Sequence, residues 1–145
     1  MIDLDLYPIL YKNRDSLKET SRDTSVPEAI EYMTSSELDV INFDLVKRAY
    51  ANDLNLSEEV AASVDAVVPL MDGILFVEFK NGKVKSREIK NKVRDSLLIF
   101  LGIIGESIEY SRKNIDFIVV IILKKILCQT SMRRVSRRKH RQELL

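Results

Sequence analysis

The sequence VDAVVPLMDGILFVEFKNGK, residues 64–83, predicts the centre of the fold. Two apolar runs flank Asp72-Gly73, and Asp-Gly between such runs is a strong signal for a two-residue hairpin turn. Asn81-Gly82 then ends the second run. We therefore predict a β-hairpin whose second strand reads ILFVEFK.

The charges of this hairpin gather at one end. A turn at Asp72-Gly73 places Asp65 opposite Lys80 and Val67 opposite Glu78. Because alternate residues of a strand share a face, Asp65, Glu78 and Lys80 point the same way. The remaining side chains of both faces are apolar. A single-residue bulge near Pro69 would alter this register.

Such a cluster predicts metal-assisted hydrolysis. Burying an unpaired charge costs several kcal/mol or more, so carboxylates at the end of an apolar strand need a reason. The oxygens of Asp65 and Glu78 can hold Mg²⁺ or Mn²⁺, which keeps several waters and accepts a phosphate oxygen. Lys80 can orient or help deprotonate the attacking water and offset charge on phosphorus. The backbone carbonyl of Phe79 is a further candidate ligand.

Asp65, twelve intervening residues and then Glu78-Phe79-Lys80 in an apolar strand resemble the core motif of the PD-(D/E)xK nuclease superfamily. The resemblance covers about residues 60–123. It implies a restriction-endonuclease-like α/β fold in which Asp65 and Glu78 bind the metal and Lys80 is catalytic. Val64 stands at the nominal proline position of the motif, and no clear strand precedes Asp65.

In that superfamily an upstream helix often supplies another glutamate. Glu28 and Glu31 are the main candidates here, and Glu58 and Glu59 remain alternatives. A simpler role for Glu28 is helix capping, because Ser25-Val-Pro-Glu28 has the pattern of a capping box. The sequence leaves the choice open.

Helices are predicted before the hairpin. The capping box predicts one from about Val26 to Thr34. The spacing of apolar residues predicts a second from about Asp44 to Leu54. Ser57 and the two glutamates after it predict a short capped turn.

A helix and a strand are predicted after the hairpin. Apolar residues recur at spacings of three and four from Ser86 to Ile104, which is typical of an amphipathic helix with a glycine C-cap. Lys90, Lys92 and Arg94 on this helix are interpreted as a solvated face rather than as a phosphate clamp. The run IDFIVVIIL has no polar face, so we expect a strand covered on both sides.

Length and composition favour one intracellular domain, residues 1–123, followed by a basic tail, residues 124–145. A chain of 145 residues can bury one core. Its single cysteine, Cys128, fits a reducing cytoplasm. The N-terminus lacks signal-peptide features, and the longest apolar run, seven residues, is too short to span a membrane.

The net charge of +1 hides an asymmetry. The tail carries eight basic residues and one acidic residue, a net of +7, so residues 1–123 carry 15 basic and 21 acidic residues, a net of −6. The tail has three interpretations. It is a nucleic-acid arm, a solvated disordered end, or the product of a frameshift that replaced the native sequence from about Ile121 onward.

Three functions compete at this stage. The first is a metal-dependent nuclease that hydrolyses phosphodiester bonds of DNA or RNA. The second is a non-catalytic immunity or regulatory protein on the same fold, which the acidic body favours because it repels nucleic acid. The third is an α/β domain in which the charged residues of the hairpin only form ion pairs and have no catalytic role. Nothing in the sequence predicts the oligomeric state.

Overall fold

The computed structural model describes residues 2–25 and 27–122. The predictions for the tail, residues 124–145, lie outside this range. The described elements are, in chain order, η1 (Leu4–Leu6), α1 (Pro8–Tyr11), β1 (Arg14–Ser16), α2 (Leu17–Thr20), β2 (Arg22–Asp23), β3 (Glu31–Tyr32), β4 (Asp39–Asn42), α3 (Phe43–Asp53), η2 (Glu58–Val60), β5 (Ala66–Leu70), β6 (Gly73–Asn81), α4 (Ser86–Ile104), α5 (Ile108–Asn114) and β7 (Ile115–Ile122).

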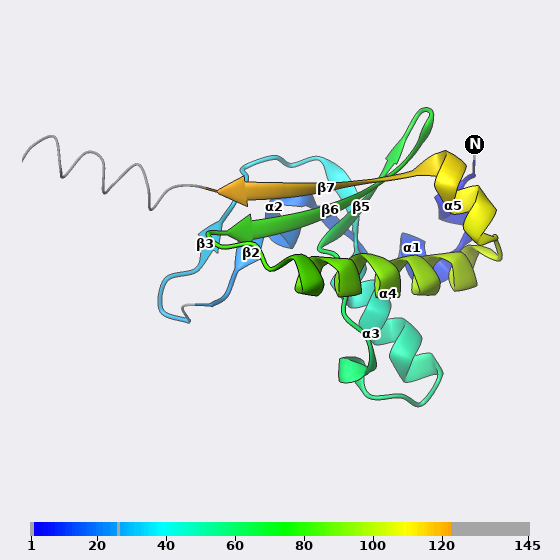
Figure 1. Cartoon of the computed structure of the whole chain (residues 1–145), viewed down its shortest axis with the longest axis horizontal. Coiled ribbons are helices and arrows are strands. Elements are labelled where there is room, and N and C mark those ends of the chain that lie inside the picture. The colour runs from blue at the N-terminus through cyan, green and yellow to red at the C-terminus, as the bar shows by residue number, and fades with distance from the viewer. Residues whose placement is uncertain (1, 26, 123–145) are drawn as a thin grey trace, which may run out of the picture.

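The fold is mixed α/β and is built on a five-stranded sheet with the order β1-β4-β5-β6-β7 (Figure 1). The pairs from β1 to β6 are antiparallel, and β6 pairs with β7 in parallel. A parallel pair needs a crossover, which α4 and α5 provide. Strands β2 and β3 form a separate two-stranded ribbon.

The β5–β6 hairpin forms, but its register differs from the predicted one. Leu70 pairs with Gly73, so Met71 and Asp72 occupy the turn. Gly73 is therefore the first residue of β6, and a Cβ there would lie 2.8 Å from the backbone oxygen of Asn114, too close for any other residue without a shift. The register moves by two positions, so every side chain keeps its predicted face.

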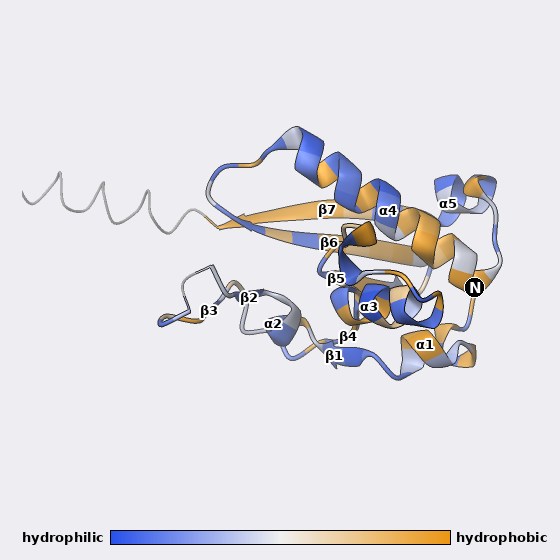
Figure 2. Ribbon diagram, turned by 90° about the horizontal axis from the view of Figure 1, so that it is seen from below, coloured by the Kyte–Doolittle hydropathy of each residue, from blue (hydrophilic) through white to orange (hydrophobic). Residues whose placement is uncertain are grey.

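The two faces of the sheet carry separate apolar clusters. Phe76 stacks within 5.9 Å of Phe43 and 5.5 Å of Phe100, measured between ring centroids, which joins β6 to α3 and α4. On the opposite face, Val77 and Phe79 belong to a smaller cluster that α2 and the segment after β3 cover. Figure 2 shows α4 on one side of β6 and the β2–β3 ribbon on the other.

Helix α4 has the predicted bounds, Ser86 to Ile104. It ends at Gly105, whose φ of 71° is left-handed and whose N–H donates to the carbonyl of Leu101. Glycine has no Cβ to oppose this conformation. Helix α3 also forms close to its predicted range, with Asn42 as its N-cap.

The predicted helix from Val26 to Thr34 is wrong. Residues 27–34 hold turns, a bend and the short strand β3. The N–H groups of Met33 and Thr34 donate to the side-chain oxygen of Ser21, and β3 pairs with β2. These contacts with an earlier segment use the N–H groups that would otherwise form helical hydrogen bonds. The helix that the capping box predicts therefore does not form.

The prediction of a strand buried on both sides is also wrong. Strand β7 forms where expected, but each of its side chains is half-buried or exposed and none is fully buried. Ile118 and Ile121 are 42% and 45% exposed. Within the described residues β7 is the last strand of the sheet, so it has a neighbour on one side only.

Candidate functional site

The charged end of the hairpin is a closed cluster around Glu78. This residue is fully buried in the middle of β6, on the face that α4 covers. Its Oε1 accepts a hydrogen bond of 2.7 Å from Lys92 Nζ and lies 3.3 Å from Lys80 Nζ. Its Oε2 is buried and has no hydrogen-bond partner among the described residues. The structure thus brings Glu78 and Lys80 together, as the hairpin pattern predicts.

Asp65 lies at the entrance to β5, beside the same cluster. Its Oδ2 accepts the backbone N–H of Phe79 over 2.7 Å. Burial, and next the charge of Glu78, raise the pKa of the Asp65 carboxyl from 3.8 to about 7. The hydrogen bond from Phe79 and the charges of Lys92 and Lys80 oppose this rise in pKa. Asp65 and Glu78 are therefore close enough to repel each other.

Lys80 is held between two carboxylates. Its Nζ contacts Glu88 Oε1 on α4 at 2.7 Å as well as Glu78. Burial lowers the pKa of Lys80, but the hydrogen bonds and charges of Glu88 and Glu78 outweigh burial, and the pKa ends above its usual value. A lysine with a raised pKa stays protonated at neutral pH, so Lys80 is suited to charge compensation rather than to removing a proton.

Lys92 was missed as a site residue. The interpretation of Lys92 as part of a solvated face is wrong, because its ammonium binds buried Glu78, whereas Lys90 and Arg94 are exposed. The signal that could have found it is its spacing. Lys92 follows Glu88 by four residues, so both reach the same side of α4.

Helix α4 also fixes the chain that leads into Asp65. The side-chain oxygen of buried Ser96 accepts the N–H of Val64 over 2.9 Å, and Asp95 accepts the N–H of Ala62 over 3.0 Å. These bonds satisfy backbone donors of an irregular segment that would otherwise be buried without partners. They place Asp65 relative to the lysines of the same helix.

Two hollows meet at Asp65. The α3-side hollow, about 610 Å³, contains Asp65 and Lys92. Its other charged residues are Asp15, Glu19, Arg22, Asp44, Lys47 and Arg48. The β2-side hollow, about 400 Å³, contains Asp65 and Lys80 together with Arg22, Asp23 and Asn81. Asp65 is thus open to two spaces, each with a different lysine of the cluster.

The donor set fits a hard divalent cation that keeps water ligands. The buried Oε2 of Glu78 lacks a partner, and Asp65 is the nearby second carboxylate. The carbonyl of Phe79 lies on the side of β6 toward Asp65, because a strand residue directs its N–H and C=O to the same side and the N–H binds Asp65. Mg²⁺ is commonly bound by one or two carboxylates plus substrate phosphates.

Neither predicted upstream glutamate joins this set. Glu28 is exposed in the turn before β3, and Glu31 is exposed on β3 itself. Since residues 27–34 form no helix, no helical face directs Glu28 toward the sheet. Glu58, the alternative in η2, pairs with Arg48 instead. Across residues 2–25 and 27–122, no group of three or more His, Cys, Asp or Glu side chains has the geometry of a metal site.

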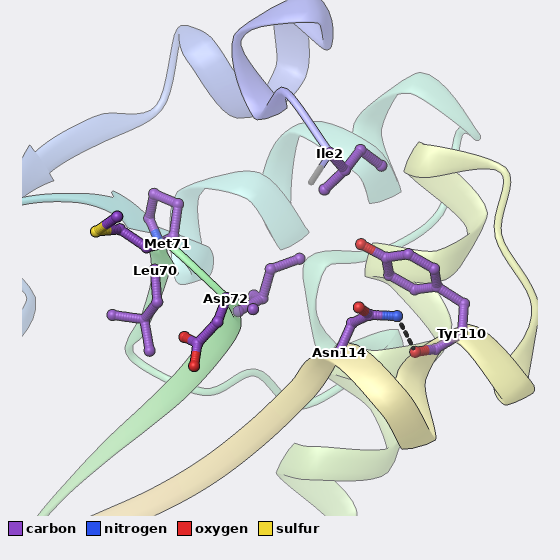
Figure 3. A pocket seen from close by; sticks show the side chains of 9 residues that line it. Ile2, Leu70, Met71, Asp72, Tyr110 and Asn114 are labelled. Carbon is purple, nitrogen blue, oxygen red and sulfur yellow. Dashed lines mark hydrogen bonds between the residues drawn. The ribbon is translucent and has the colours of Figure 1, made fainter.

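A third hollow lies at the opposite end of the hairpin, near its turn. Figure 3 shows this space, about 150 Å³, between Met71 and Asp72 of the turn, Ile2, and Tyr110 and Asn114 of α5. Asn114 donates to the carbonyl of Tyr110 over 2.9 Å and so uses part of its polar capacity within α5. Among the described residues Asp72 is the only acidic one that lines this hollow, so the paired carboxylates belong to the other end.

Comparison with known proteins assigns no family. No family model matches the chain, and no curated protein or solved structure shows significant similarity to it. Among the helices in the described part of the chain, none has the length and apolar character needed to cross a membrane.

Proposed function

We propose that this protein is a metal-dependent nuclease with a restriction-endonuclease-like core, acting in the cytoplasm on DNA or RNA. The supporting observation is the buried Oε2 of Glu78, which has no partner although two lysines surround the other oxygen of the same carboxylate. A buried oxygen without a partner costs about 1–3 kcal/mol or more, and a bound cation removes that cost.

The order of elements supports the same proposal. An antiparallel hairpin, a crossover helix and a strand parallel to the second hairpin strand follow one another from β5 to β7. Strand β4, which the sequence did not predict, pairs with β5 and supplies a strand before Asp65. The succession of a hairpin, a helix and a strand supports the resemblance to the superfamily.

Each residue then has a distinct part in the hydrolysis. Asp65, Glu78 and the Phe79 carbonyl would hold Mg²⁺ or Mn²⁺, which lowers the pKa of bound water and polarises the phosphate. Water adds across the phosphodiester: its oxygen bonds to phosphorus, the bond to the leaving sugar oxygen breaks, and a proton passes to that oxygen. In the role that the motif assigns to it, Lys80, protonated, would offset the negative charge that develops on the phosphate oxygens.

The test is a thermal melt combined with a nuclease assay. Mn²⁺ at a hundred times its dissociation constant should stabilise the wild type by about 2.7 kcal/mol, because it binds only the folded form. Glu78→Gln should lose this response and any cleavage. Glu88→Gln is the matched control, since it removes the exposed carboxylate partner of Lys80 and should keep the response.

The alternative is a non-catalytic protein that binds another protein. The charges favour it: residues 1–123 carry a net of −6, and the α3-side hollow balances four basic residues against four acidic ones. Nucleic acid is attracted by a basic surface, which these residues do not provide. A wild type that neither binds Mn²⁺ nor cleaves would favour this alternative, or a cluster whose charges only pair.

A further inference from the structure

The two lysines that contact Glu78 have different surroundings. Lys80 has a second carboxylate partner, Glu88, at 2.7 Å. Lys92 has Glu78 as its only ion-pair partner among the described residues. An ammonium group has three N–H donors, so Lys92 keeps more unused donor capacity than Lys80.

The two lysines also lie in different hollows, and Lys92 lies in the larger one. Lys92 lies in the larger α3-side hollow with Asp65, and 23% of its side chain is exposed. Lys80 lies in the smaller hollow, tied to α4 through Glu88.

The balance of charges shows which lysine would lose its partner when a cation binds. If the carboxylate of Glu78 serves a divalent cation, it can no longer neutralise two ammonium groups as well. Lys80 then keeps its 2.7 Å contact with Glu88, whereas among the described residues no second carboxylate lies within 4.0 Å of Lys92 Nζ. Lys92 is therefore the group that needs a new anion, and a substrate phosphate in the α3-side hollow supplies one.

We propose that Lys92 is the ammonium group that contacts the substrate phosphate, while Lys80 is a positioning residue that contacts Glu78 directly and is itself paired with Glu88 on α4. This inference rests on the proposed nuclease function and changes the role that the sequence motif assigns to Lys80. It locates the substrate backbone in the α3-side hollow, which α2, α3, the segment before β5 and Lys92 of α4 line.

The test compares Lys92→Met with Lys80→Met, with Lys90→Met as the matched control because Lys90 is exposed on the same helix and outside the cluster. Binding of a fluorescein-labelled DNA or RNA oligonucleotide is followed by anisotropy in Ca²⁺, which suppresses turnover, over a range of salt. Lys92→Met should weaken binding about tenfold and lower the salt slope by about one phosphate contact. The other two variants should keep the wild-type slope.

Cleavage in Mn²⁺ gives the second readout. Lys92→Met should lower kcat by about 100-fold or more, the range for a group that acts on the reacting atoms, and Lys92→Arg should recover part of it. Mn²⁺ binding by calorimetry should survive in Lys92→Met, because Asp65 and Glu78 remain. Lys80→Met should reduce kcat less than tenfold and lower the melting temperature.

The outcomes separate the two proposals. A wild type that shows neither Mn²⁺ binding nor cleavage overturns the nuclease function and this inference with it. An active wild type, with Lys92→Met unchanged in salt slope and kcat while Lys80→Met is inactive, overturns the inference alone. Should Lys92→Met fail to fold, Lys92→Gln, which removes the charge but can still donate a hydrogen bond to Glu78, replaces it in the same measurements.

Discussion

Strands β6 and β7 lie side by side in parallel, yet the strand with more charged residues is the more deeply buried. β7 carries one charged residue, Asp116, whereas β6 carries Glu78 and Lys80. Glu78 is fully buried, while Ile118 and Ile121 of the more apolar strand are nearly half exposed. The apolar strand is at the margin of the described sheet, and the charged strand is inside it (Figure 1).

The difference shows that the neighbours of a strand, rather than its own hydrophobicity, decide how deeply it is buried. β6 has strands on both sides and helices or loops over both faces, so every position in its middle is enclosed. An apolar residue there follows the general tendency of cores, but a carboxylate opposes it. The contrast therefore singles out Glu78, whose burial opposes this tendency and is accompanied by contacts with Lys80 and Lys92.

The largest predicted effect tests how deeply β6 and β7 are buried. Phe76→Ala on β6 should lower the free energy of unfolding by about 3–5 kcal/mol, because it empties the centre of the Phe43, Phe76 and Phe100 cluster. Ile118→Ala on β7 should cost about 1 kcal/mol or less, since that side chain is 42% exposed. Urea denaturation of both variants measures the difference. Equal losses would show that β7 is covered in solution.

The next effect concerns pH and the charged end of β6. The pKa of Asp65 rises from 3.8 to about 7 on folding, so between these values the folded protein binds more protons at this carboxyl than the unfolded chain. Its contribution to stability is therefore complete near pH 4 and is lost as the pH rises through 7. Because a shift of one pKa unit corresponds to about 1.4 kcal/mol, the stability lost at this carboxyl is a few kcal/mol.

Asp65→Asn should remove that slope in metal-free buffer. An amide oxygen can still accept the N–H of Phe79, while the charge that faces Glu78, Lys80 and Lys92 is gone. Stability of the variant relative to wild type should increase between pH 4 and pH 8, as measured by denaturation at each pH. A wild type that gains stability over this range relative to Asp65→Asn would show that the lysines dominate the environment of Asp65.

The sequence predicts those parts of the fold whose signals are local. Helix α4 is correct at both ends because a long amphipathic repeat finishes at a glycine that can adopt positive φ. The helix expected from Val26 fails because distant Ser21 takes its donors. Strands β1 and β4 are three and four residues long, too short to show a period, so only pairing with each other and with β5 reveals them.

The candidate site was predictable to the extent that it lies within one hairpin. Glu78 and Lys80 share a face whichever register the turn selects, because the error of two positions preserves alternation. Lys92 and Glu88 reach the same cluster from α4, and their contribution depends on how that helix packs across β6. Residue spacing within α4 shows that the two share a side, but not which strand they meet.

A smaller effect is expected where the start of β6 lies against the residue that precedes β7. Gly73→Ala at the start of β6 should cost about 1–2 kcal/mol, because its Cβ would lie 2.8 Å from the backbone oxygen of Asn114, immediately before β7. Gly102→Ala is the control. Its nearest neighbour is the end of the flexible Tyr50 side chain at 3.1 Å, and alanine favours the helix. Thermal melts that show no difference between the two would mean that β7 moves to accommodate the methyl group.

The smallest effect compares a buried and an exposed carboxylate on one lysine. Glu88→Gln removes the shorter contact of Lys80, 2.7 Å, but about half of the Glu88 side chain is exposed. Lys80 also lowers the pKa of Glu88 through its hydrogen bond and its charge. Because water and salt screen such a pair, the loss should be about 0.2–1 kcal/mol and should shrink further at high ionic strength. Lys80 keeps Glu78 and stays in place. A loss in urea denaturation well above this range, unchanged by salt, would mean that Glu88 rather than Glu78 holds the lysine, and the closed end of β6 would then depend on α4 alone.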